Sequence, residues 1–132
     1  MTRRIRSLLF IIVLLASTNL LAQSQSEIQV EDIAVCTSID NRVPVGTADS
    51  FSADVGKLYC YTKLKSESDM YTISHVWFYN DKQMAKIDLS VKAKSWRTWS
   101  AKTIIPAWNG SWRVEVHDSD GKVISKIPFE IK

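Results

Sequence analysis

Along most of the chain, hydrophobic residues recur at every second position, which is the period of a β-strand with one buried face. The clearest example lies near the C-terminus, where Trp112, Val114 and Val116 alternate with polar residues. Between Met70 and Tyr79 the alternation is two-sided, because apolar side chains fall on both faces. This pattern predicts a central strand, and helical periodicity is hard to find anywhere after the first residues.

Turn residues separate the apolar segments at short intervals. Further strands are predicted at Ile28–Val35, Leu58–Leu64, Met84–Val91, Ser95–Ile105 and Val123–Ile131, with a short one at Ser50–Ala53 and an irregularity in the first near Glu31-Asp32. Turns are predicted at Asn80-Asp81-Lys82, Asn109-Gly110 and Asp118-Ser119-Asp120-Gly121. The fold class is therefore all-β, an antiparallel immunoglobulin-like β-sandwich of about seven strands, with a closed barrel as the alternative.

The first residues have a different pattern. Arg3, Arg4 and Arg6 precede an apolar run from Leu8 to Ala16. This arrangement is that of a secretory signal peptide, and the run is shorter than the about 20 apolar residues that a membrane span requires. We expect cleavage after Ala22, giving a signal peptide at residues 1–22 and a single β-sandwich domain at residues 23–132. The protein should be exported, periplasmic or secreted, without a membrane span after cleavage.

The charge balance changes when the signal is removed. The chain has 17 basic and 14 acidic residues, and three of the basic residues are the arginines of the signal. The remaining domain is formally neutral. This balance gives no reason to expect a nucleic-acid partner.

Two cysteines, Cys36 and Cys60, lie in the predicted exported domain. An oxidising compartment would allow them to pair, and a bridge would stabilise the fold by about 3 kcal/mol on the loop-entropy model. We predict this disulfide. The alternative is two separate buried thiols, since the sequence does not show whether the two side chains face each other.

Tryptophan is the most conspicuous residue type. The five are Trp77, Trp96, Trp99, Trp108 and Trp112. Such a cluster either fills a small core or presents flat rings to a ligand. Trp112 is assigned to the core because Val114 and Val116 share its face. Trp96 and Trp99 fall on opposite faces of a regular strand, so one of them should be exposed or lie at a bulge.

Polar side chains accompany these rings. His75 shares a strand face with Trp77, and Arg97 shares one with Trp99, where a guanidinium can stack on an indole. The candidate ligand-binding residues are His75, Trp77, Arg97, Trp99, Ser100 and Lys102. Each also has a structural interpretation, as a core side chain or part of a surface ladder. We expect a division, with Trp77, His75 and Trp112 structural and Arg97, Trp99 and Lys102 on an accessible face.

Several segments together resemble a known bacterial family. They are His75-Val76-Trp77-Phe78-Tyr79-Asn80, Met84-Ala85, Trp96-Arg97-Thr98-Trp99-Ser100-Ala101-Lys102, Gly110-Ser111-Trp112-Arg113-Val114, Asp118-Ser119-Asp120-Gly121 and Asn41-Arg42-Val43-Pro44. The chain resembles domain-of-unknown-function family 2914 over nearly all of the predicted domain. The resemblance implies an exported or membrane-tethered domain and brings no assigned activity. Where family members often carry a further arginine, this chain has Ser95, which argues against a paired-guanidinium site.

Catalytic and metal templates are not matched. The two histidines, His75 and His117, are too few for a histidine-rich zinc site, and no H-E-x-x-H or C-x-x-C spacing occurs. Asp118-x-Asp120-Gly121 is similar to the start of a calcium loop but lacks its later ligands, so a hairpin turn is expected. We therefore predict no metal, no cofactor and no catalytic residue.

The leading functional hypothesis is a non-catalytic cell-envelope binding module that takes a glycan or an extended peptide in an aromatic and cationic groove. The alternative is a structural or assembly component of an envelope protein complex. A minor alternative is an enzyme with His75 as acid or base. That role would need a second polar group within hydrogen-bond reach of His75, in a cleft.

Overall fold

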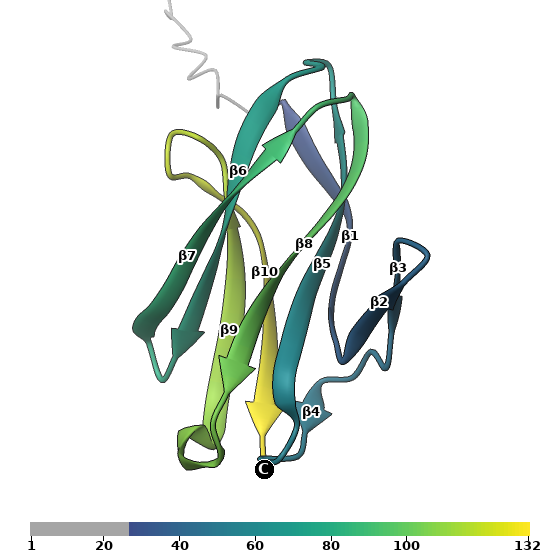
Figure 1. The fold of residues 1–132 in the computed structure, drawn as a ribbon. Coiled ribbons are helices and arrows are strands. Elements are labelled where there is room, and N and C mark those ends of the chain that lie inside the picture. Colours follow the sequence, from purple (N-terminus) through teal and green to yellow (C-terminus); the bar gives the residue numbers. More distant parts are fainter. Residues whose placement is uncertain (1–26) are drawn as a thin grey trace, which may run out of the picture.

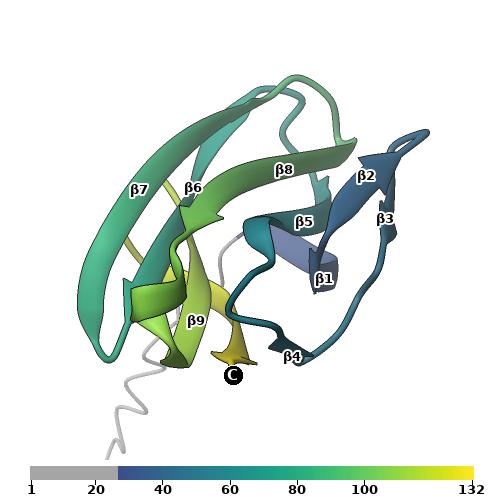
Figure 2. The same ribbon diagram turned by 60° about the horizontal axis from the view of Figure 1, so that its bottom comes forward.

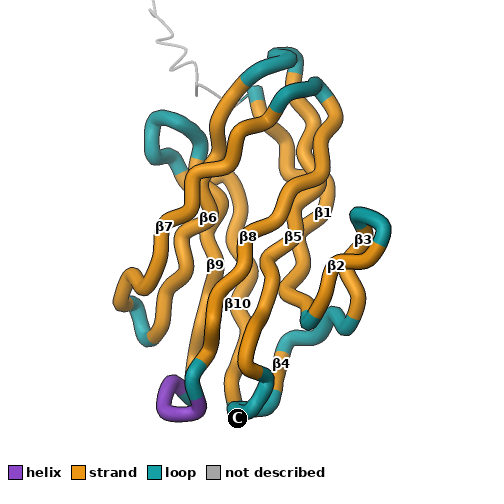
Figure 3. Tube along the Cα trace, viewed as in Figure 1, coloured by secondary structure: helices purple, strands orange, loops and turns teal. Residues whose placement is uncertain are grey.

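Strands make up most of residues 27–132, the part of the chain that this computed structural model describes (Figure 3). They are β1 Ile28–Cys36, β2 Ser38–Asp40, β3 Val43–Val45, β4 Ser50–Phe51, β5 Gly56–Ser66, β6 Tyr71–Tyr79, β7 Lys82–Val91, β8 Ser95–Ile104, β9 Gly110–His117 and β10 Val123–Ile131. One short 3-10 turn, Pro106–Trp108, connects β8 to β9. The predicted signal peptide and its cleavage site lie outside the described residues.

Two sheets face each other (Figure 1). One has three strands in the order β1-β5-β8, and the other has five in the order β4-β10-β9-β6-β7. All pairs in them are antiparallel except β4 with β10. Apart from the two-residue β4, the sheets contain seven long strands. The all-β, antiparallel immunoglobulin-like sandwich is therefore confirmed, and the closed barrel is wrong.

The core lies between the sheets and is built from the strand faces that the alternation predicts. Its main cluster consists of Val35, Phe51, Leu58, Cys60, Trp77, Ile104, Trp112, Val114, Phe129 and Ile131. A second cluster contains Leu64, Ile73, Val91 and Val116. The Phe129 ring lies 6.1 Å edge-on from Trp77 and 5.9 Å from Trp112, on which it stacks. The core position predicted for Trp112 is confirmed.

Two tight turns place residues in the left-handed region of the backbone. Asn80 and Asp81 join β6 to β7 with φ of 45° and 65°, and Asn41 and Arg42 join β2 to β3 with φ of 48° and 62°. Positive φ at both central residues is the geometry of a type I′ hairpin turn. The hairpin predicted at Asn80-Asp81-Lys82 is confirmed. The hairpin of β2 and β3 was not predicted.

The β2–β3 hairpin packs on the side of the three-stranded sheet that faces away from the other sheet (Figure 2). The Thr37 N–H donates to the Val45 carbonyl at 3.1 Å, which closes the hairpin at its base. Gly46 follows with φ of 72°, and a Cβ there would collide with the Thr37 side chain. A larger residue at position 46 would therefore disturb the base of the hairpin.

Within residues 27–132, no helix has the length and apolar character needed to span a bilayer.

The predicted disulfide is not present, and the strand register gives the reason. Cys60 lies opposite Val35 in the β1–β5 pair, whereas Cys36 lies opposite Tyr59. Directly opposed residues share a sheet face and successive residues alternate, so the two thiols point to opposite faces. Both are buried and free. Burial raises the pKa of both thiols. The alternative of two separate buried thiols is therefore correct.

This geometry predicts that the folded protein keeps two free thiols under oxidising conditions. Thiol titration in denaturant, after purification without reductant, should detect both. Added reductant should leave the melting temperature unchanged. A fall of several degrees on reduction would instead indicate a bridge and a different β1–β5 register.

Candidate functional site

Three of the six candidate residues lie inside the sandwich. His75 and Trp77 of β6 have 0% exposure, and Ser100 of β8 has 4%. Their side chains meet between the two sheets, since the His75 Nδ1 atom is 2.7 Å from Ser100 Oγ and the Trp77 Nε1 atom is 3.1 Å from it. The expectation that His75 and Trp77 are structural is confirmed.

The hydrogen bonds of this buried group form a directed chain. Trp77 Nε1–H can only donate, so Ser100 Oγ accepts from it and gives its own proton to His75 Nδ1. His75 Nε2 then carries the ring proton and donates to Thr62 Oγ1 at 3.2 Å. The Thr62 hydroxyl donates in turn to the Thr98 carbonyl at 3.4 Å. Every polar atom of the group has a partner when His75 is neutral.

Burial lowers the pKa of His75 from 6.5 to about 4, which favours this neutral form. The enzyme hypothesis required a polar group within hydrogen-bond reach of His75. Ser100 is such a group. The cleft is missing, because the imidazole is completely covered. His75 and Ser100 join the two sheets and are not open to a substrate.

Arg97 and Trp99 lie on the opposite face of β8. In the register of β5 with β8, Trp99 is directly opposite Tyr61 and Arg97 is directly opposite Lys63. Cys60 and Leu64 of β5 point into the core, so Tyr61 and Lys63, the alternate positions between them, point outward. Both Arg97 and Trp99 are half-buried. They share a face, as predicted.

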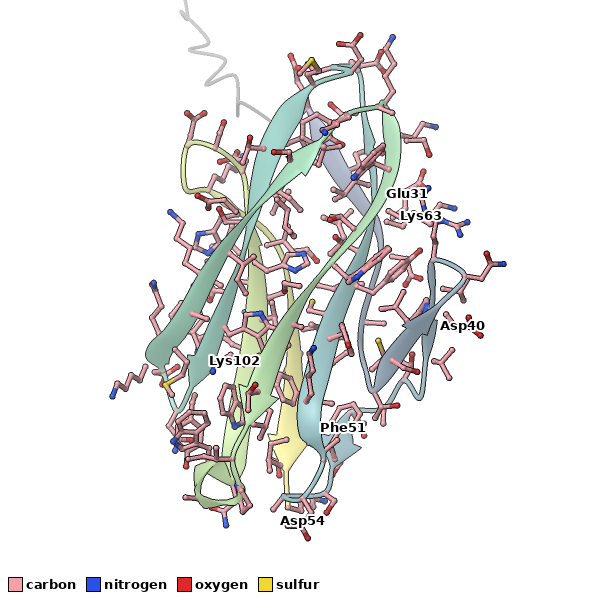
Figure 4. All side chains as sticks on the ribbon, in the orientation of Figure 1. Glu31, Asp40, Phe51, Asp54, Lys63 and Lys102 are labelled. Carbon is pink, nitrogen blue, oxygen red and sulfur yellow. The ribbon has the colours of Figure 1, made fainter. Side chains whose placement is uncertain are left out.

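Lys102 is on the other side of the sheet. It is opposite Leu58, whose side chain is in the core, and its ammonium lies 4.9 Å from the centre of the Trp108 ring. Figure 4 shows Lys102 toward β9 and Lys63 on the side of the β2–β3 hairpin. Arg97 and Lys102 therefore do not line one groove.

The prediction that the six candidate residues line one groove is wrong, because they do not all lie on the same face of the sheet. His75, Trp77 and Ser100 are core residues, Arg97 and Trp99 point outward, and Lys102 has the parity of Ser100. Positions 97 and 102 differ by an odd number, which places them on opposite faces of a regular strand. The signal that separates Arg97 from Lys102 was thus already present in the spacing.

The outward face of β1, β5 and β8, here called the outer face, is aromatic and cationic. Tyr59 and Tyr61 of β5 lie beside Trp99 of β8. Tyr61 is only 3% exposed although it points away from the core. Burial raises the pKa of its hydroxyl, while the charges of Arg97 and of Arg42 lower it and Asp32 raises it. Two guanidinium groups therefore lie close to one phenol.

Arg42 is the residue that the sequence analysis missed. It occupies the turn between β2 and β3, and its guanidinium lies over the Trp96 ring, 5.7 Å from the ring centre. Together with Ser95, Trp96 and Arg97 it lines an open hollow of about 290 Å³. The Asn41-Arg42 dipeptide was the available signal for a tight turn. The sequence did not show that Arg42 packs against Trp96, which lies far along the chain.

The outward face of the other sheet is an ion-paired ladder on β9. Arg113 contacts Glu115 at 2.8 Å and also Asp81, and its guanidinium lies 4.1 Å from the centre of the Phe78 ring. His117 binds Glu115 at 2.9 Å. These side chains satisfy one another and cover this part of the sheet.

Within the described part of the chain, no group of three or more His, Cys, Asp or Glu side chains is placed to hold a metal ion. Asp118 forms the predicted turn, because its carboxylate accepts hydrogen bonds from the backbone N–H groups of Asp120 and Lys122.

The fold and its outer face define an immunoglobulin-like β-sandwich with a compact aromatic and basic surface. Residues 70–131 match the family model described as "Protein of unknown function (DUF2914)". This match is to the same family that the motifs resemble, and it confirms that resemblance for this part of the chain. The Asn41–Pro44 motif lies outside the matched range.

Among solved structures, two crystal structures of a beta-glucosidase from Listeria innocua, one in complex with glucose, match at 12% identity with TM-scores of 0.45 and 0.42. These matches cover 80% of this chain and 16% of the glucosidase chain. A CARDB domain from Pyrococcus furiosus, in complex with di-metal ions, matches at 11% identity and a TM-score of 0.43, covering 83% of this chain and 95% of the domain. A search of curated proteins finds no match.

Proposed function

We propose that this protein is a non-catalytic binding module of the cell envelope that takes a glycan on the outer face of its three-stranded sheet. The observation that carries the proposal is the half-buried Trp99 ring on that face, with the half-buried Tyr59 diagonally across from it on β5. Large, rigid rings with a polar tip give contact area at low entropic cost, which suits stacking against sugar rings. The face also offers cations for polar groups of the ligand.

An extended peptide is the other ligand that the sequence suggested. β8 is an edge strand, paired on one side with β5 only, so its free edge could add a peptide strand. The glycan is favoured because the aromatic rings lie on the face of the sheet and not along this edge.

A role in an envelope assembly is supported by a different feature. Val43 and Val45 of β3 are each 46% exposed and, two residues apart on one strand, share a face of the hairpin. A partner protein could cover them. Crosslinking in the native envelope would favour this role if capture of a protein depended on Val45 while glycan binding did not.

The glycan proposal predicts that Trp99→Ala weakens binding strongly while leaving the protein folded. Binding would be screened by thermal shift against soluble glycans and peptidoglycan fragments, then measured by calorimetry. Loss of a stacked indole should weaken binding by roughly 10-fold or more, a typical effect for an aromatic anchor.

Trp108→Ala is the matched control. Trp108 is also half-buried beside a cation, but it lies near β9 on the other side of the sheet. It should bind as the unmodified protein does. Equal losses in the two variants, or no ligand in the whole screen, would remove the support for a glycan site on the outer face.

A further inference from the structure

The β2–β3 turn brings Arg42 to the start of β8, next to Arg97. These two arginines are far apart in the sequence, and Ser95 had argued against a paired-guanidinium site on β8 itself. The second guanidinium comes from the hairpin instead. Both arginines line the hollow of about 290 Å³, together with the Ser95 side chain and the Trp96 ring.

Neither arginine is neutralised by an acid. None of the ion pairs found within residues 27–132 uses Arg42 or Arg97. In the register of the sheet, Asp32 is separated from Arg97 by Lys63 on the intervening strand. Two strand spacings correspond to about 9–10 Å between the backbones, and among the described residues no ion pair joins Asp32 to Arg97. Glu31, a neighbouring acid on β1, pairs with Lys63 at 3.7 Å.

The backbone at Arg42 is a second, independent indication. Its φ of 62° lies in the left-handed region, where a residue with a side chain is strained and glycine is preferred in this turn type. Strain of this kind is concentrated where a side chain is needed for function. Here it holds an exposed guanidinium over Trp96, beside Arg97.

From this pairing we infer that Arg42 and Arg97 bind a carboxylate of an acidic glycan whose sugar rings contact Trp99 and Tyr59. The inference rests on the proposed function and names its ligand class. Planar guanidinium groups match a carboxylate with two parallel hydrogen bonds, which an ammonium group does not provide. The Ser95 hydroxyl can complete the contact.

The spacing of the site fits one sugar ring and its acid group. Arg97 and Trp99 are two residues apart on β8 and point to the same side, so their Cα atoms are separated by roughly 6–7 Å. A hexuronate residue can therefore stack on the indole while its carboxylate reaches the guanidinium. An acidic peptide would use the arginines but would leave the rings without a partner, and for that reason the glycan is favoured.

The test compares three probes of matched length at low ionic strength: trigalacturonate, neutral galactotriose and triglutamate. The unmodified protein should bind trigalacturonate roughly 10-fold more tightly than galactotriose, and added salt should reduce that difference. Arg42→Gln and Arg97→Gln should each remove the preference while keeping the weaker neutral binding. Lys86→Gln, which removes an exposed cation from β7 of the other sheet, should behave as the unmodified protein.

Three further variants separate charge, geometry and folding. Arg42→Lys and Arg97→Lys keep the positive charge but lose the planar guanidinium with its two parallel donors. Each should therefore retain only part of the preference for trigalacturonate. Arg42→Gly removes the guanidinium and relieves the positive φ, so the melting temperature should not fall although the preference is lost. A loss of binding without a loss of stability would show that the side chain itself contacts the ligand.

The outcomes distinguish this inference from the function on which it rests. Equal binding of trigalacturonate and galactotriose, both sensitive to Trp99→Ala, would overturn the carboxylate site and leave the glycan function intact. Binding of triglutamate alone would overturn both and point to an acidic peptide. No binding of any probe, or a preference that survives Arg42→Gln and Arg97→Gln, would likewise overturn the inference.

Discussion

Replacement of Trp77 by alanine is expected to lower the free energy of unfolding by about 3–5 kcal/mol. Trp77 is completely buried between the sheets and packs edge-on against Phe129. Alanine would leave a cavity that two rigid sheets cannot close. The loss is a large part of the about 5–15 kcal/mol that stabilises a typical domain.

The measurement is urea unfolding followed by circular dichroism, with a calorimetric melting temperature expected to fall by roughly 10–25 °C. Trp77→Phe keeps most of the ring volume but leaves Ser100 Oγ without its donor, so it should cost about 1 kcal/mol beyond the change in packing. Trp99→Ala, at a half-buried position on the outer face, should cost less than half as much as Trp77→Ala. A similar cost for both alanine variants would contradict the placement of Trp77 in the core.

Acid should destabilise the protein through His75 by about 3 kcal/mol. Burial lowers the pKa of this imidazole to about 4 in the folded protein, whereas the unfolded chain has the ordinary value of 6.5. Below pH 6.5 the unfolded state binds a proton that the folded state does not. The stabilisation is therefore complete above pH 6.5, falls progressively with decreasing pH, and is lost near pH 4.

Physically, protonation of His75 would break the buried chain of hydrogen bonds. A proton on Nδ1 would turn the Ser100 hydroxyl away from the ring, and no carboxylate contacts the imidazole to balance the new charge. Glu115 adds acid sensitivity at lower pH: burial opposes the effect, but hydrogen bonds from Arg113 and His117 lower the pKa of this carboxyl overall. Its stabilisation is lost only as the pH falls through that lowered pKa.

The test is the free energy of unfolding between pH 7 and pH 4.5 for the unmodified protein, His75→Asn and His117→Gln. His75→Asn should be less stable at pH 7 and show a flatter pH dependence through this range. His117→Gln leaves the buried hydrogen bonds of His75 in place, so it should keep the loss of stability that His75 causes. If His75→Asn and the unmodified protein lost stability in parallel, the pKa of His75 would not be lowered by burial.

Much of the strand architecture follows from local patterns that the sequence contains. Two-sided alternation between Met70 and Tyr79 identified the central strand β6, and the clean alternation from Trp112 to Val116 identified the inner face of β9. The Asn80-Asp81 turn joins β6 to β7, and β1 has its irregularity between Val30 and Asp32, as expected from the break near Glu31-Asp32. Side-chain alternation and turn chemistry are local, so neighbouring residues are sufficient to reveal them.

The relations between strands depended on the tertiary structure. The bulge and pairing of β1 against β5 decided that Cys36 and Cys60 face away from each other. The packing of two sheets, and not any feature of β6 alone, placed Ser100 against His75. Register and sheet packing are set by contacts between distant segments of the chain. A one-residue shift in register would turn every side chain of a strand to the other face, and no local pattern encodes the register.

The candidate site divides in the same way. Arg97 and Trp99 were found from their spacing on one strand face, and their separation from Lys102 was implicit in the same spacing. The sequence could not show that Arg42 and Arg97 line the same hollow, because this requires the β2–β3 hairpin to fold over the outer face. Strand periodicity determined which side each residue of β8 presents, and only the long-range packing of the hairpin decided which other residues meet it there.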